Sequence, residues 1–172
     1  MVKGQRAAVR PAGGRAAPHR DAIATRIFEG LLRGELGRED LTARRLASYV
    51  GQSTIFVYHH YGSLDGLLIR VDGAGWTHLF EILRDREARG ADGPALAEAF
   101  LEFAFAHPAL YWLMAERPFD RIRLAAEGRL SLAEPIWSAF VALTERHGAR
   151  APELDAQALL GGLHGLAALE LG

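Results

Sequence analysis

The sequence predicts an all-α protein, and three observations carry that prediction. Apolar residues recur at the three-to-four-residue spacing of helices along most of the 172-residue chain. Residues that cap helices, such as Ser, Thr and Gly, stand at the ends of these stretches. The alternation of apolar and polar residues that marks a half-buried strand is absent from the sequence. We therefore expect helices and the turns that join them.

Composition suits a globular protein of a reducing compartment. Hydrophobic residues make up 49% of the chain, enough for a sizeable core, and the formal net charge is −1. The chain has no cysteine, which excludes disulfides and thiolate metal sites. No apolar run reaches the roughly 18 residues that cross a membrane, and the first residues lack the apolar stretch of a signal peptide. We expect a cytoplasmic protein with no membrane partner.

The first 20 residues differ in composition from the rest. They hold five basic side chains and no acidic one, among Gly, Pro and Ala: Lys3, Arg6, Arg10, Arg15 and Arg20. Such a segment cannot bury a core, so we expect 1–20 to be a disordered basic arm.

The first predicted helix begins at Asp21 and ends before a loop at 34–40. Its apolar residues share one face and should brace the helices that follow: Ile23, Ile27, Phe28 and Leu31. The loop is rich in residues that favour turns: Gly34, Gly37 and Asp40.

A second, short helix is predicted after Leu41. Thr42 can cap its start, with Leu41 and Leu46 packed around the cap as a hydrophobic staple. Gly51 suits the turn that ends this helix, because glycine adopts a left-handed backbone at little cost.

A third helix follows the turn. Ser53 can cap it, and Val57 and Tyr58 are expected to face inward. Two short helices joined by a glycine-containing turn form a helix-turn-helix, which presents its second helix to a DNA groove.

This segment resembles the DNA-binding domain of the tetracycline-repressor (TetR) family of bacterial transcription regulators. Three stretches carry the resemblance: LTARRLA at 41–47, VGQS at 50–53 and VYHHYGSLDGLL at 57–68. The family's pattern is roughly T-x-R-x-L-A, then L-G-V-S, then L-Y-x-H-F-G-S-K-E-x-L-L.

The resemblance implies a division of the chain and a function. An N-terminal three-helix DNA-binding domain at 21–63 would be followed by a helical effector-binding and dimerisation domain at 64–172. The implied protein is a dimeric, ligand-responsive regulator, most simply a repressor, that a small-molecule effector releases from a palindromic DNA operator. The alternative is a helical small-molecule-binding protein with degenerate DNA reading. We find no catalytic motif, and we expect no enzyme activity, no cofactor and no metal site.

The expected DNA contacts combine the exposed face of the third helix with positions that the family uses. They are Thr42, Arg44, Ser53, Thr54, Ile55, Phe56, Tyr58, His59 and His60. Arg44 can hold a guanine edge or a phosphate through two hydrogen bonds, or it can be a solvated charge. The basic arm can lie along phosphates or reach into a minor groove, or it can be a solubilising tail.

Three positions depart from the family pattern. Gln52 stands where a small apolar residue is common, and Phe56 where a small residue such as threonine is usual. Phe56 can contact a thymine methyl group or turn into the core. Leu64 replaces a phosphate-binding lysine, so we expect one phosphate contact fewer per subunit.

The second domain is expected to enclose a small apolar effector. Helices are predicted from Ser63 onward and over 94–106, 108–117, 120–147 and 152–171, with 120–147 interrupted near Gly128 or Pro135. The candidate pocket residues are Trp76, His78, Phe103, His107, Trp112 and Trp137. Each of these side chains could instead belong to the ordinary core. Leu163-His164-Gly165 also resembles the Trp-His-Gly-type motif of one subgroup of the family, with leucine in the tryptophan position.

Two further expectations concern assembly and motion. Small residues alternate with leucines on the 152–171 helix, which predicts a homodimer surface or intramolecular packing. The candidate interface residues are Leu159, Gly162, Leu163 and Leu166. Gly73 and Gly75 are expected to interrupt the helix that starts at Ser63 and to act as a hinge, or else to permit close packing.

Overall fold

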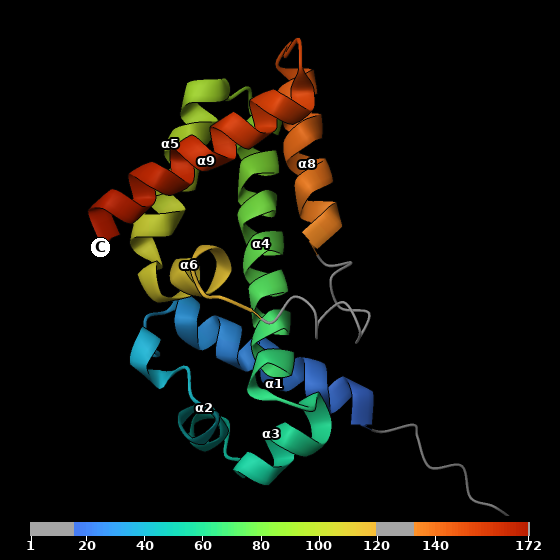
Figure 1. The fold of residues 1–172 in the computed structure, drawn as a ribbon, viewed down its shortest axis with the longest axis vertical. Helices are drawn as coiled ribbons and strands as arrows, with labels where there is room; N and C mark the ends of the chain where they lie inside the picture. The colour runs from blue at the N-terminus through green and yellow to red at the C-terminus, as the bar shows by residue number, and fades with distance from the viewer. Residues whose placement is uncertain (1–15, 120–132, 172) are drawn as a thin grey trace, which may run out of the picture.

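The computed structural model describes residues 16–119 and 133–171 of the chain. Every regular element in these two ranges is a helix, which confirms the predicted all-α class (Figure 1). Residues 1–15 of the predicted arm and residues 120–132 of the predicted 120–147 helix lie outside the described residues. None of the described helices is both long enough and apolar enough to cross a lipid bilayer.

The N-terminal elements form a unit that we call the head. It consists of α1 (Ala16–Leu32), the short 3-10 helix η1 (Arg38–Asp40), α2 (Ala43–Tyr49) and α3 (Thr54–Tyr61). Ile27 and Leu31 of α1 are almost completely buried, as the apolar stripe predicts. Figure 1 places α2 and α3 at one end of the molecule, with α1 lying across them.

Helix α1 begins at Ala16 and not at Asp21, so the predicted end of the arm at residue 20 was wrong. The physical reason lies in the first residues of the helix. Ala16 and Ala17 are strong helix formers, and Pro18 is tolerated in a first turn, where backbone N–H groups have no partner within the helix.

The predicted helix caps are confirmed. The hydroxyl of Thr42 accepts a hydrogen bond from the backbone N–H of Arg45 at 3.3 Å, and the hydroxyl of Ser53 accepts one from that of Phe56 at 3.2 Å. Gly51, between the two helices, has φ +70°, the left-handed conformation that favours glycine. Local chemistry therefore fixes both helix starts and the turn of the helix-turn-helix.

The inward-facing pair of α3 differs from the prediction. Val57 and Tyr61 are each 1% exposed, whereas Tyr58 is 54% exposed. Residues four apart lie on the same helix face, so Tyr61 shares the face of Val57 and Tyr58 turns away. Tyr58 is therefore available at the surface.

Helix α4 (Leu64–Ala88) runs without a break from the head to the other end of the molecule (Figure 1). The predicted interruption at Gly73 and Gly75 was wrong. A Cβ atom on Gly75 would lie 2.6 Å from the sulfur of Met114, so glycine here allows close packing. A Cβ on Gly73 would meet nothing within 4 Å.

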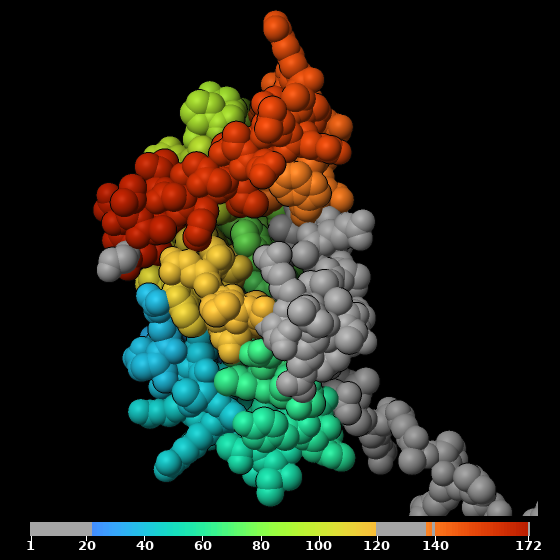
Figure 2. Space-filling view, in the orientation of Figure 1, coloured from blue at the N-terminus to red at the C-terminus, as the bar shows by residue number. Residues whose placement is uncertain are grey.

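Four more helices of the described residues belong to what we call the upper domain: α5 (Gly93–Ala106), α6 (Pro108–Ala115), α8 (Ala133–Arg146) and α9 (Pro152–Leu171). Three of them match the predicted helices closely, and α8 covers the described part of the fourth. In Figure 1, α9 crosses α5 and α8 at the end of the molecule far from α3. The space-filling view in Figure 2 shows α9 laid over that end as a surface element.

One continuous apolar core joins the head to the upper domain. It includes Ile27 of α1, Leu67 and Leu79 of α4, Phe100 of α5 and Phe140 of α8, all nearly inaccessible to solvent. Because α4 contributes to both halves of this core, a shift of α4 is felt at α3 as well as in the upper domain.

Candidate functional site

The outer face of α3 presents a compact set of exposed side chains. Ile55 is 77% exposed and Tyr58 is 54% exposed, and Thr54 and His59 are exposed as well. Ser53 is exposed at the start of the helix. Since α3 lies at the extreme end of the molecule (Figure 1), this face can approach a large flat partner without interference from the upper domain.

Phe56 and His60 lie together at the edge of this face. Their ring centroids are 4.0 Å apart, and the ring of His59 lies 4.9 Å from that of His60. Phe56 is half-buried and packs against the core, so its position lies between the two expected alternatives. Its ring also packs against the ring of His60.

The two arginines of α2 differ in their surroundings. Arg45 lies 3.7 Å from the carboxylate of Asp40, whereas no ion pair joins Arg44 to any described residue. Both line an open hollow of about 600 Å³ together with Thr42, Ser48 and Glu39. Arg44 is thus the cation of this hollow that has its hydrogen-bonding capacity available to an anion.

A hydrogen-bonded cluster holds α2 against α1. The hydroxyl of Tyr49 donates to Glu35 at 2.6 Å, and Arg33 donates to the same carboxylate at 2.7 Å. The hydrogen bond from Arg33 has the larger effect and that from Tyr49 the next, and together they lower the pKa of Glu35 to about 2. Gly30 admits the Tyr49 ring, because a Cβ there would lie 2.5 Å from the phenol oxygen. The cluster thereby helps to fix the position of α2, which packs against α3.

Residues 21–63, which make up most of the head, carry no net charge, because they hold five arginines and five acidic residues. Attraction to a polyanion must therefore come from local placement, such as that of Arg44, and from the basic residues at 1–20.

The six predicted pocket residues do not gather in one place. His78, Phe103 and His107 gather where the upper domain meets the head, with Phe103 ring centroids 6.2 Å from His78 and 5.1 Å from His107. The buried Nδ1 of His107 has no hydrogen-bond partner, and burial lowers the pKa of this imidazole.

The three tryptophans lie apart from that group. Trp76 is buried beside Phe140, with centroids 6.4 Å apart. Trp112 carries the guanidinium of Arg38 4.5 Å above its ring. Trp137 is 37% exposed on α8.

An apolar cavity of about 130 Å³ lies elsewhere, between α4, α5, α8 and α9. None of the six predicted residues lines it. Its walls include Leu83, Leu96, Phe100, Phe140 and Leu163. Phe100 follows Leu96 by one helical turn, but this spacing is the same for a cavity wall and for ordinary core, so the sequence offers no signal that separates them.

Residues 94–172, which span α5 to α9, match the family model described as the tetracyclin repressor-like, C-terminal domain. The same chain carries, in α2 and α3, the helix-turn-helix with its confirmed caps. Residues 94–172 therefore form a C-terminal domain of the TetR type. The general role of the chain is thus the regulation of transcription, and membership of the Trp-His-Gly-type subgroup stays a prediction.

A solved structure has the same fold as this chain. The crystal structure of SCO4313, a candidate regulatory protein, matches with a TM-score of 0.55 and 24% sequence identity. The match covers 91% of this chain and 85% of that chain. A comparison with curated protein sequences found no match.

Helix α9 buries some of its apolar residues and exposes others. Leu163 is 7% exposed and packs inward, and Leu159 is half-buried. Leu166, two turns after Leu159, is 53% exposed, and a Cβ on Gly162 would meet nothing within 4 Å. Of the four predicted interface residues, Gly162 and Leu166 are thus accessible to a second chain, while Leu159 and Leu163 face their own.

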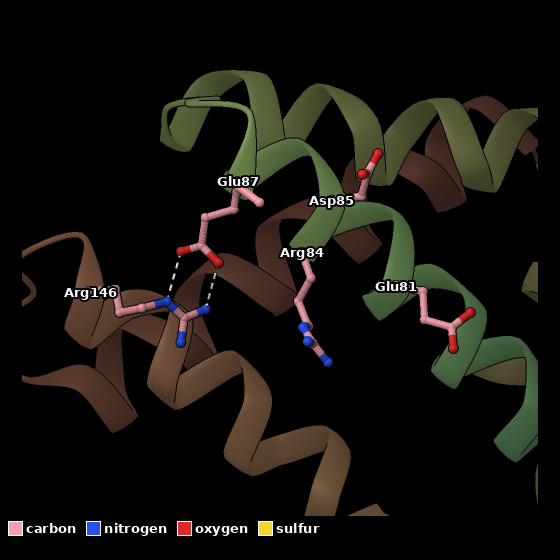
Figure 3. A pocket seen from close by; sticks show the side chains of 6 residues that line it. Glu81, Arg84, Asp85, Glu87 and Arg146 are labelled. Carbon is pink, nitrogen blue, oxygen red and sulfur yellow. Dashed lines mark hydrogen bonds and ion pairs between the residues drawn. The ribbon is translucent and has the colours of Figure 1, made fainter.

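Ion pairs tie α4 to α8 beside the cavity. Glu87 accepts two hydrogen bonds from the guanidinium of Arg146, at 2.7 and 2.8 Å (Figure 3), and the ring of His147 lies 3.5 Å away. The bonds from Arg146 lower the pKa of Glu87. Figure 3 also shows Arg84 pointing away from Glu87 into an open groove on α4. We interpret this groove as a solvated surface.

Two polar contacts among the described residues tie α6 and the residues after it to the lower part of the molecule. Arg117 donates to Asp65 at the start of α4 at 2.7 Å, and both side chains are largely shielded from solvent. The second contact is the stacking of the Arg38 guanidinium on the ring of Trp112. Helix α6 also packs directly against α1, so movement of α6 is transmitted to both η1 and α1.

Proposed function

We propose that this chain is a dimeric, ligand-responsive transcription regulator of the TetR family, cytoplasmic and most simply a repressor, that binds a palindromic DNA operator. The observation that carries the proposal is the exposed outer face of α3 on a capped helix-turn-helix at the end of the molecule. A second helix held in this way can enter a major groove without moving the rest of the chain.

The roles of the individual residues follow from where they lie. Thr54, Ile55, Tyr58 and His59 would face the base edges, because they are the exposed residues of α3. Ile55 is suited to the methyl group of thymine. Phe56 would act mainly by positioning His60.

Phosphate contacts would come from helix starts and from arginine. Thr42 and Ser53 stand at the N-termini of α2 and α3, where backbone N–H groups favour an anion. Arg44 would add a charged contact, since it has no ion pair with the described residues. The half-buried Leu64 supplies no cation, so the basic arm would offset the missing contact.

A dimer would place two heads on one side of the DNA duplex. Successive major grooves lie about 34–36 Å apart, and the heads must match that spacing or a multiple of it. Helix α9, with its exposed Gly162 and Leu166, is the proposed contact between subunits, because its small residues let a two-fold mate approach closely. A small-molecule effector bound in the upper domain would change the spacing and release the operator.

The alternative function is a helical small-molecule-binding protein that has lost DNA reading and, like the leading proposal, has no catalytic role. Two observations favour it: Phe56 is partly withdrawn into the core, and residues 21–63 carry no net charge. The two functions differ in how strongly they depend on DNA and on salt.

The test measures binding of the full-length chain to a mixed-sequence DNA duplex at 50 and 200 mM salt. A regulator should bind at low salt and lose affinity steeply as salt rises, because each phosphate contact releases counterions. Arg44→Ala should weaken binding and reduce the slope of log K against log salt by about 1. Arg84→Ala, an exposed arginine on α4, is the control and should leave both unchanged. Absence of DNA binding at 50 mM salt would favour the alternative.

A further inference from the structure

The apolar cavity between α4, α5, α8 and α9 has the properties of a ligand site. We propose that it binds one small uncharged molecule, aromatic or alicyclic, of about six to eight non-hydrogen atoms. The effect of such a ligand on DNA rests on the proposed function, but its binding does not.

The size of the cavity sets the size of the ligand. Its volume is about 130 Å³. An engineered protein cavity of about 150 Å³, lined by leucine, isoleucine and phenylalanine, stays free of water and binds benzene. A cavity of this size with the same kind of lining therefore suits a single six-membered ring with at most a small substituent.

The walls select an apolar ring. Phe100 and Phe140 face each other edge to face, with centroids 6.3 Å apart, and Leu83, Leu96 and Leu163 close the floor. Offset and edge-to-face contacts with Phe100 and Phe140 favour an aromatic guest. Since the floor residues are each less than a tenth exposed, most of the ligand surface would leave water on binding.

The polar groups of the lining are already committed. The hydroxyl oxygen of Thr144 lies 2.8 Å from the carbonyl oxygen of Val141 and 2.9 Å from that of Pro152. His147 stands half-exposed at the rim, next to Glu87, which also binds Arg146. No charged group is left in the described lining to compensate a buried ammonium or carboxylate, so the ligand must be neutral.

The cavity borders α9, the helix proposed to form the contact between subunits. Leu159 and Leu163 of α9 line it, and Gly162 and Leu166 are exposed on the same helix. A ligand that fills the cavity holds α9 at a fixed distance from α5 and α8. The spacing of the two heads would then respond to occupancy through α9.

The experiment is a calorimetric titration of the full-length chain, without DNA, with toluene and with benzylamine. We expect saturable binding of one toluene per chain and at least a 10-fold weaker affinity for benzylamine, which has the same ring with a positive charge. Absence of toluene binding, or equal affinity for both compounds, would overturn the proposal.

Two substitutions on α5 locate the site. Ala97→Phe places a ring in the mouth of the cavity and should weaken toluene binding at least 10-fold. The matched control is Ala106→Phe, an exposed position on the same helix, which should bind toluene as the unmodified chain does. Full toluene affinity in a folded Ala97→Phe variant would place the ligand elsewhere and refute the assignment.

A third variant keeps the proposal testable if Ala97→Phe fails to fold. Leu159→Ala enlarges the cavity from the half-buried rim, so it should increase the affinity for naphthalene relative to toluene at least 5-fold. An unchanged ratio would contradict the site. If toluene binds but the chain binds no DNA, the ligand site stands and the proposed regulator fails. If the chain binds DNA but not toluene, the proposed regulator stands and the ligand site fails.

Discussion

The head and the upper domain reach their structures by different routes. In the head, helices of seven or eight residues begin at a side-chain cap, and each cap bonds an N–H three residues away. In the upper domain, the cavity walls bring together residues that are far apart in the sequence, such as Leu83 and Leu163. The end of the molecule that holds α3 therefore depends on local chemistry, and the end that holds the cavity depends on long-range packing.

The two ends of the molecule should respond differently when a helix shifts. A surface fixed by local caps stays intact when the packing around it shifts, so α3 can be moved as a rigid unit. A cavity formed by four helices changes shape whenever one helix moves. The long helix α4 contributes to both, and it is the element through which a change in one can reach the other.

The largest expected effect concerns a buried carboxyl group on α4. Asp72 on α4 is 8% exposed, and burial raises its pKa from 3.8 to about 7. Between these values the native chain binds a proton that the unfolded chain has released. Stability should therefore fall as pH rises from 4 to 7, by up to about 4 kcal/mol.

Asp72→Asn should remove this loss, because the amide stays neutral and its oxygen can still accept the hydrogen bond of the Trp76 indole. Urea unfolding at pH 5 and pH 8 checks the prediction. The variant should gain most at pH 8, and the exposed Asp85→Asn serves as control. An equal stability change at both pH values would mean that Asp72 is charged in the native state.

The next effect concerns α2, where two neighbouring arginines differ in their partners. Arg44→Ala should cost about 1–3 kcal/mol of DNA-binding free energy, because it removes a charged contact with no competing partner. Arg45→Ala should cost less, since Asp40 already engages that side chain. Fluorescence anisotropy with one duplex at one salt concentration measures both. A larger loss for Arg45 would reverse the assignment of roles.

A smaller effect separates a hinge from close packing in α4. Gly73→Ala should stabilise the chain by up to about 1 kcal/mol, because a Cβ meets nothing there and alanine favours the helix. Gly75→Ala should gain less or lose stability, since its Cβ would press on Met114. Thermal unfolding compares the two variants. If both gain equally, the approach of α4 to α6 is looser than described.

The smallest effect concerns the ion pairs next to the cavity. Glu87→Gln should lower stability by less than about 1 kcal/mol, because the pair with Arg146 is partly exposed. The loss should shrink further at 1 M salt. A loss above 3 kcal/mol would show that these ion pairs, and not the apolar walls, hold α8 in place.

The sequence predicts best those features that depend on residues nearby in the chain. Thr42, Gly51 and Ser53 were identified correctly, because caps and left-handed turns depend only on residues nearby in the chain. Tyr58 was expected to face inward, but Tyr61, three residues later, occupies the buried site. Both side chains have an apolar ring and a polar tip and could fill it.

The cavity could not be predicted for a different reason. Phe140 of α8 and Leu163 of α9 meet only through the crossing of two helices, and no spacing in the sequence encodes that crossing. The same holds for Gly75, whose importance depends on Met114 of another helix. The six aromatic and histidine residues proposed for effector binding stay a prediction.

We propose that two copies of α3 read DNA from one dimer. This can be tested by selecting binding sites from a random-sequence DNA pool with the full-length chain and sequencing the retained DNA. We expect an enriched two-fold palindrome whose half-sites lie one helical turn apart, about 10–10.5 base pairs, or a multiple of it. Retained DNA with no common sequence, or a single site without two-fold symmetry, would contradict it.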